Sequence, residues 1–267
     1  QNVGALKAIR TKCEAVGDYA GLAEVLERQL EAMDADGDAD RLAGELGELL
    51  LTQLQQSERA IPLLTRAIAS RADVKWLILL ADAHEAQGGF EPALVCLGDA
   101  LLKTTGVENG AVRLRRSQVY MGLDRAQDAS VDLIEACMIA GDDFVLTDEM
   151  RSVFDQADAW GALAERILSD MGTDDEDTLN PRLGDVLAEA LAGPLEAAGI
   201  AAEAWSRLVG STEGNQRYGH AYAAWLEAHE EWSLLEALYR QWSSHTPDGR
   251  LDIDVRRARL LGRDEAS

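Results

Sequence analysis

One pattern of spaced residues recurs along the whole chain and limits its possible folds more than any other feature. Its clearest copy is Ala93, Leu97 and Ala100, in which a small, a large and a small residue follow one another four and three positions apart. Full or weaker copies begin at seven positions, 33 to 38 residues apart: Leu22, Ala60, Ala93, Ala129, Leu163, Ala201 and Leu235. Residues at i, i+4 and i+7 lie on one face of an α-helix. The chain is therefore predicted to be an array of similar helical units.

Residues 76–102 contain the most complete unit, WLILLADAHEAQGGFEPALVCLGDALL. Ala81 is the small residue of a first helix, Gly88 and Phe90 mark a turn, and the series from Ala93 forms a second helix. Small residues let two antiparallel helices approach closely. The unit resembles the tetratricopeptide repeat, a helix–turn–helix unit of 34 residues. This resemblance implies an all-α, right-handed α-solenoid of about seven helix–turn–helix repeats plus a C-terminal capping helix.

The predicted domain organisation is one tetratricopeptide-like solenoid over residues 1–267. Its repeats are expected at about 3–38, 40–72, 73–108, 109–141, 143–178, 181–212 and 215–247, with the cap at 250–263. The turn of the sixth repeat has two possible places, near Gly193-Pro194 or near Gly199. Aromatic residues at gaps of 70 to 72 are predicted to plug the turns of alternate repeats: Tyr19, Phe90, Trp160 and Trp232. Gly17, Gly88 and Gly122 are predicted to form tight turns.

Charge and hydropathy exclude several classes of partner. The 48 acidic and 25 basic residues give a formal net charge of −23, which repels phosphate backbones and argues against nucleic-acid binding. No apolar run approaches the 18 or so residues of a membrane span, so no direct membrane insertion and a cytoplasmic location are expected. Because Gln1 stands where Met would, the chain is expected to be part of a longer protein.

The stretch DADGDAD, residues 34–40, has most of a calcium-loop pattern. Carboxylates occupy loop positions 1, 3, 5 and 12 as Asp34, Asp36, Asp38 and Glu45. Position 6, which is normally glycine because the loop turns sharply there, is Ala39. We therefore predict a solvated turn in which Asp38 or Asp40 caps the next helix, and no metal site.

No motif for catalysis or cofactor binding is found. Cys13, Cys96 and Cys137 lack metal-ligand spacing and fall in apolar helical patterns, so they are predicted to be packed thiols. The four histidines form no HExxH motif, and there is no GxSxG or phosphate-binding loop. The chain is predicted not to be an enzyme and to need no cofactor.

The candidate binding residues lie on the first helices of the repeats, which line the inner groove of such solenoids. They form stripes with acidic ends and an apolar middle: Lys75, Ile78, Asp82, Glu85, Leu114, Gln118, Met121, Asp148, Asp155, His220 and Glu227. The Lys, Asn and Arg clamp with which this family binds acidic C-terminal tails is not reproduced. A protein or peptide partner with a basic flank is expected instead, although a merely solvated face gives the same pattern.

These observations predict a non-catalytic scaffold or adaptor that binds a peptide or protein through its groove. The alternative is a regulatory or sensor segment of a larger multidomain effector or enzyme. Self-association through terminal repeats is also possible, because an uncapped end of an array exposes a packing surface.

Overall fold

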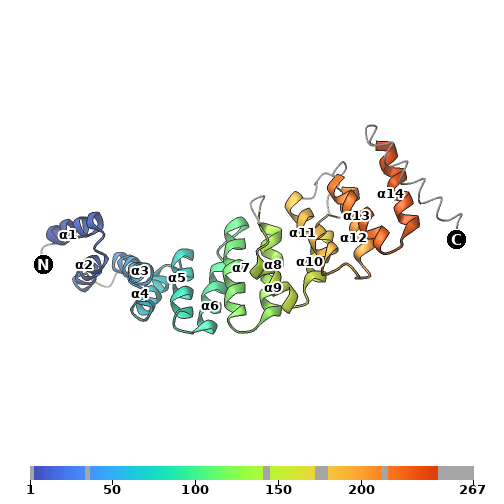
Figure 1. The fold of residues 1–267 in the computed structure, drawn as a ribbon. Helices are drawn as coiled ribbons and strands as arrows, with labels where there is room; N and C mark the ends of the chain where they lie inside the picture. The colour runs from blue at the N-terminus through green and yellow to red at the C-terminus, as the bar shows by residue number, and fades with distance from the viewer. Residues whose placement is uncertain (1–2, 34–36, 141–144, 172–179, 212–215, 246–267) are drawn as a thin grey trace. The chain divides into compact units, whose positions relative to one another are not determined.

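The computed structural model describes residues 3–33, 37–140, 145–171, 180–211 and 216–245. Within these ranges it contains fourteen α-helices and no strand, and successive helices pair into seven hairpins (Figure 1). The described residues form an all-α helical-repeat fold of helix–turn–helix units. The prediction of an all-α repeat protein is thus confirmed, whereas the right-handed course of the array stays a prediction. The predicted cap at 250–263 lies outside the described residues.

The hairpins fall into two compact units, residues 1–141 and 142–267. The first unit contains α1 Val3–Val16, α2 Tyr19–Glu31, α3 Gly37–Thr52, α4 Ser57–Ser70, α5 Val74–Glu85, α6 Phe90–Leu101, α7 Gly106–Met121 and α8 Ala126–Ile139. The second contains α9 Asp148–Gln156, α10 Trp160–Asp170, α11 Pro181–Ala192, α12 Ala201–Ser211, α13 Gln216–Ala228 and α14 Trp232–His245. Both candidate turn sites of the sixth repeat belong to the linker between α11 and α12.

Two helices begin earlier than the packing pattern indicates. α3 starts at Gly37 and α7 at Gly106, each three residues before the predicted start of its repeat. The first residues of both helices are exposed. The exposed first turn of α7 could not be found from a pattern of buried residues, whereas the buried Ala39 in the first turn of α3 was assigned to the solvated turn DADGDAD.

The small–large–small series forms the core of the hairpins in the first unit. Ala93, Leu97 and Ala100 are completely buried, as are Ala60, Leu64 and Ala67 of the preceding repeat. The alanines bring the backbones of the paired helices close together, and the leucines fill the remaining space. The core residues are therefore those that the sequence pattern indicated.

Six of the seven hairpins turn through a left-handed residue, two positions before the second helix begins. These residues are Gly17, Gln55, Gly88, Asp124, Asp158 and Glu230, with φ between 49° and 74°. Gly122 lies in the turn after α7, as predicted, but its φ is an ordinary −62° and the left-handed residue of this turn is Asp124. Gly122 is small for another reason: a Cβ there would lie 2.7 Å from the ring of Phe90.

The predicted aromatic plugs differ in their burial. Trp160 is 5% exposed and its Nε1 donates a hydrogen bond of 2.7 Å to Asp155 Oδ1. Phe90 and Trp232 are half-buried, whereas Tyr19 is 42% exposed. The prediction is therefore confirmed at Trp160 and wrong at Tyr19, the exposed first residue of α2.

The described part of DADGDAD is helical. Because α3 begins at Gly37, Asp38 and Asp40 lie inside its first turn, and the prediction that either caps the helix was wrong. Ala39 is completely buried in the core, which rules out the turn that a calcium loop makes at its sixth position. The hydrogen bond from Arg66 lowers the pKa of Asp40 below its usual value. Residues 34–36 lie outside the described ranges.

Candidate functional site

The predicted binding residues all lie on first helices of hairpins, but in two units that are taken separately. The first unit contains Lys75, Ile78, Asp82 and Glu85 on α5, with Leu114, Gln118 and Met121 on α7; the second contains Asp148 and Asp155 on α9, with His220 and Glu227 on α13. We call the side of each unit that these first helices present its first-helix face.

Ion pairs join successive first helices across this face in the first unit. They connect α1 with α3 through Arg10 and Glu45 (3.2 Å), α3 with α5 through Glu48 and Lys75 (2.7 Å), and α5 with α7 through Asp82 and Arg115 (2.8 Å). Arg115 also pairs with Glu85. Each repeat is thus tied to the next by charge as well as by apolar packing.

The second unit repeats the arrangement. Arg151 on α9 pairs with Glu189 on α11 at 2.5 Å, and Asp185 on α11 pairs with Arg217 on α13 at 3.0 Å. The partners are 38 and 32 residues apart, about one repeat length. A charged residue on one first helix therefore lies opposite an oppositely charged residue on the first helix of the next repeat. Several basic residues of this acidic chain form such pairs.

These pairs change the charge expected on the first-helix face. Burial disfavours the charged form of Arg115, but hydrogen bonds and attraction from Asp82 and Glu85 outweigh it and hold its pKa above the usual value. Two carboxylates and one guanidinium leave a single negative charge at this point, and Lys75 offsets Glu48. The sequence stripes counted the carboxylates but missed Arg115, which a search for opposite charges one repeat apart would have found.

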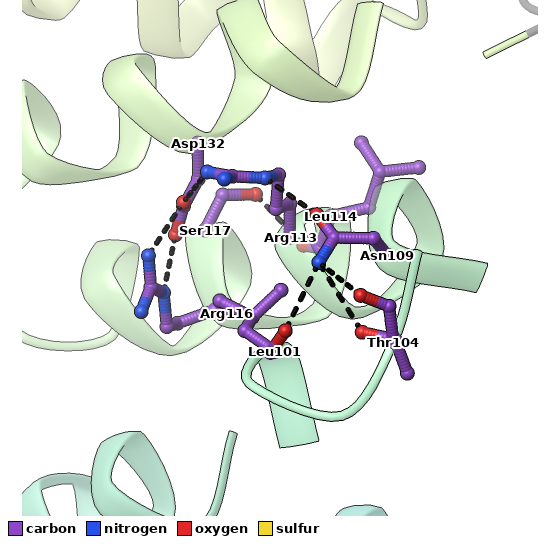
Figure 2. A network of polar contacts seen from close by, with 8 residues as sticks. All are labelled: Leu101, Thr104, Asn109, Arg113, Leu114, Arg116, Ser117 and Asp132. Carbon is purple, nitrogen blue, oxygen red and sulfur yellow. Dashed lines mark hydrogen bonds and ion pairs between the residues drawn. The ribbon is translucent and has the colours of Figure 1, made fainter. Parts of the chain in front are cut away.

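A second polar network lies within the fourth hairpin (Figure 2). Asp132 on α8 is 1% exposed and accepts hydrogen bonds from Arg113 Nη1 at 3.1 Å and from Arg116 Nε and Nη2 at 2.6 and 2.7 Å. Arg113 Nε also donates to Asn109 Oδ1 at 2.9 Å. The amide of Asn109 in turn donates to the backbone oxygens of Leu101 and Thr104. The network therefore connects the end of α6 with α7 and α8.

The polar groups of this network are held in place rather than poised for reaction. Hydrogen bonding to Asp132 raises the pKa of Arg116 above its usual value, so this guanidinium is charged across the whole physiological range. Burial raises the pKa of Cys137 to about 12, which keeps its thiol protonated and unreactive. Among the described residues, no three His, Cys, Asp or Glu side chains gather closely enough to hold a metal ion.

The predicted binding residues of the second unit also have structural partners. Asp148 is 97% exposed and pairs with Arg151, and Asp155 accepts the hydrogen bond from Trp160. His220 lies edge-on to Trp242 with ring centroids 5.4 Å apart, and Glu227 accepts a hydrogen bond from the hydroxyl of Tyr239.

A hollow of about 470 Å³ adjoins the first-helix face of the first unit, between α3, the end of α4 and the start of α5. The half-buried ring of Trp76 forms part of its wall and packs so closely on α3 that a Cβ on Gly44 would lie 2.4 Å from the ring. Its charged lining comprises Asp38, Asp40, Glu45, Glu48 and Asp73 with Arg41, Arg71 and Lys75. The hollow therefore combines one aromatic surface with a polar rim of both signs.

Comparisons with known proteins find likeness in structure only. No family model matches the sequence, and no curated protein matches it. A tetratricopeptide repeat protein from Parabacteroides merdae has a TM-score of 0.48 at 16% identity, covering 97% of this chain and 98% of its own. The C-terminal part of a TPR repeat-containing protein from Cytophaga hutchinsonii has 0.44 at 12%, covering 92% and 97%. The TPR2AB domain of yeast Sti1, in complex with a pHSP90, has 0.36 at 15%, covering 84% and 98%.

The described helices add one observation about membranes. None of them is both long and apolar enough to cross a bilayer.

Proposed function

We propose that this chain is a non-catalytic protein-interaction module that binds a peptide or protein segment on the first-helix face of its first unit. The observation that carries the proposal is the hollow beside Trp76, which is large enough for a partner side chain and offers it an aromatic surface. Half-buried Ile78, Leu114 and Met121 add apolar contact area on the same face.

The partner's chemistry follows from the charges that remain after internal pairing. The five carboxylates that line the hollow are balanced by the three cations of its lining together with Arg66 and Arg10, which pair with Asp40 and Glu45 from outside it. The surplus negative charge on this face lies farther along α5, where Asp82 and Glu85 together keep one negative charge beside Arg115. A segment with a basic flank and an apolar centre matches this surface. Because several of the carboxylates are already ion-paired, attraction acts mainly on the association rate and weakens with salt.

Screening a displayed peptide library against the purified chain tests the proposal. We expect the selected peptides to share apolar residues beside lysine or arginine. Asp82→Asn combined with Glu85→Gln changes the net charge around Arg115 from −1 to +1 with almost no change in shape. Association of a selected peptide should slow about three- to tenfold at low salt, because electrostatic steering is reversed locally.

Glu24→Gln combined with Glu31→Gln is the matched control, because it removes the same two charges from the exposed face of α2. Circular dichroism melting of each variant separates slower binding from unfolding. Equal association rates for both variants and the wild type would show that the charges beside Arg115 do not steer the partner and that the part of the first-helix face between α5 and α7 is not the site.

A further inference from the structure

The second helices carry an independent signal on the opposite side of the hairpins. The position two residues after the start of each packing series is exposed in all seven repeats. It holds Glu24, Pro62, Val95, Val131, Glu165, Glu203 and Ala237. A large apolar residue thus occurs in the third and fourth repeats alone, where Val95 is 66% and Val131 60% exposed.

A second position on the same helices, six residues after the start of each packing series, also distinguishes the third and fourth repeats from the others. Six residues after the start of the series stand Arg28, Arg66, Asp99, Glu135, Ser169, Arg207 and Gln241. Carboxylates occur there in the third and fourth repeats alone, whereas three other repeats have arginine. Leu102, 86% exposed, and the half-buried Met138 follow one turn later. Both helices therefore present a valine, a carboxylate and a large apolar residue in register.

Arg125 links the starts of these two helices. Its guanidinium lies 3.6 Å from Glu91 in the first turn of α6 and 2.7 Å from Asp128 in the first turn of α8. Val95 follows Glu91 by one turn, and Val131 follows Asp128 by about one turn. Because Arg125 reaches the first turns of both helices, we infer that the two valines stand at similar heights above these turns, on the second helices of successive repeats that both pack against α7.

This combination has no evident role in folding. Valine is a weaker helix former than glutamate or alanine, and these valines are too exposed to contribute much to the core. Single exposed apolar residues are common, but exposed apolar residues that recur at the same positions on the second helices of two successive repeats favour an interaction surface. We call Val95, Asp99, Leu102, Val131, Glu135 and Met138 the outer patch.

We propose that the outer patch is a second docking surface, and that its occupant is an amphipathic helix of a partner protein with Lys or Arg beside its apolar ridge. The i and i+7 spacing of Val95 and Leu102 matches the ridge of such a helix. Asp99 and Glu135 lie between the apolar contacts and favour a basic flank. A second copy of this chain is disfavoured as the occupant, because both copies carry a net charge of −23.

A synthetic helical peptide tests the proposal with the full chain. Its probe form carries leucines at i, i+3 and i+7 flanked by lysines, and its control form has glutamates in place of the lysines. Fluorescence anisotropy should show binding of the lysine form and none of the glutamate form. Val95→Asp with Val131→Asp should weaken binding at least tenfold while leaving the melting temperature nearly unchanged, because both positions are exposed.

Two controls separate this site from the first-helix face and from general charge effects. Ala69→Asp with Ala237→Asp adds the same two charges at exposed positions of other second helices and should leave binding unchanged. Asp82→Asn with Glu85→Gln should also leave it unchanged, even if that variant affects peptides selected for the first-helix face. Failure of the lysine peptide to bind, or binding that is insensitive to the valine substitutions, would overturn the proposal. So would wild-type self-association that Val95→Asp with Val131→Asp abolishes, since the occupant would then be a second copy.

Discussion

Replacing Asp132 with alanine should be among the most damaging single changes in the first unit. The substitution removes the acceptor of three hydrogen bonds from Arg113 and Arg116 and leaves two guanidinium groups facing an apolar gap. Breaking a buried ion pair by removing one partner costs about 3–5 kcal/mol. The two arginine side chains are 25% and 23% exposed, so they recover part of their hydration. We therefore expect a loss of about 2–4 kcal/mol.

Urea denaturation followed by circular dichroism measures this loss, and hydrogen-exchange mass spectrometry locates it. Exchange should accelerate most in α7 and α8, because the network joins these helices and each repeat contacts mainly its neighbours. Asp128→Ala is the matched control on the same helix. Its partner Arg125 is 42% exposed and Asp128 itself 48%, so this loss should stay below about 1 kcal/mol.

A triple replacement distinguishes the free-energy cost of leaving two arginine charges unpaired from the cost of losing the hydrogen bonds of the network. Asp132→Leu with Arg113→Leu and Arg116→Met removes all three charges and keeps apolar volume, so it should be less destabilising than Asp132→Ala alone. If Asp132→Ala costs no more than Asp128→Ala, the buried network contributes little and the reasoning from its burial is refuted.

Three further predictions concern the core, a tyrosine and a turn. Trp160→Ala should lower the unfolding free energy of the second unit by about 3–5 kcal/mol. Phe90→Ala should cost the first unit less, because the ring of Phe90 is only half-buried. Equal losses of the two variants in chemical denaturation would contradict this prediction. Burial, together with its hydrogen bond to Asp185, raises the pKa of Tyr218 to about 12, so the stability it contributes is fully present below pH 10 and is lost between about pH 10 and 12. Burial also raises the pKa of Tyr222, so absorbance at 295 nm should show a late-ionising component that Tyr218→Phe reduces but does not abolish. Glu230→Gly should raise the free energy of unfolding by about 0.5–1 kcal/mol, because glycine adopts the observed φ of 59° without steric strain from a Cβ atom. A lower melting temperature of this variant would count against the left-handed turn.

The sequence determined the helices and the inside of each hairpin. Alanines such as Ala60 and Ala93 and leucines such as Leu64 and Leu97 recur at helical spacing, and all four are completely buried. This was predictable because the contacts are local: helix periodicity and close approach of adjacent helices depend on residues within one repeat.

The candidate site was less predictable than the fold. The stripes of first-helix residues were located correctly on their helices, but the partners of Asp82 and Glu85 were not foreseen. Asp132 was missed for a related reason, because a pattern search treats a carboxylate as a surface residue unless its two arginine partners are known. Left-handed turns at Gln55 and Glu230 were also missed, since neither residue type favours that backbone conformation.

Only the tertiary structure decided which charges are paired and which apolar side chains stay uncovered. The ion pairs between first helices join residues 27 to 38 positions apart, so they depend on how one hairpin docks on the next. Val95 and Leu97 are both apolar and two residues apart on α6, yet one is 66% exposed and the other fully buried. Hydropathy states how strongly a side chain avoids water, whereas the packing of neighbouring helices determines whether it is removed from water.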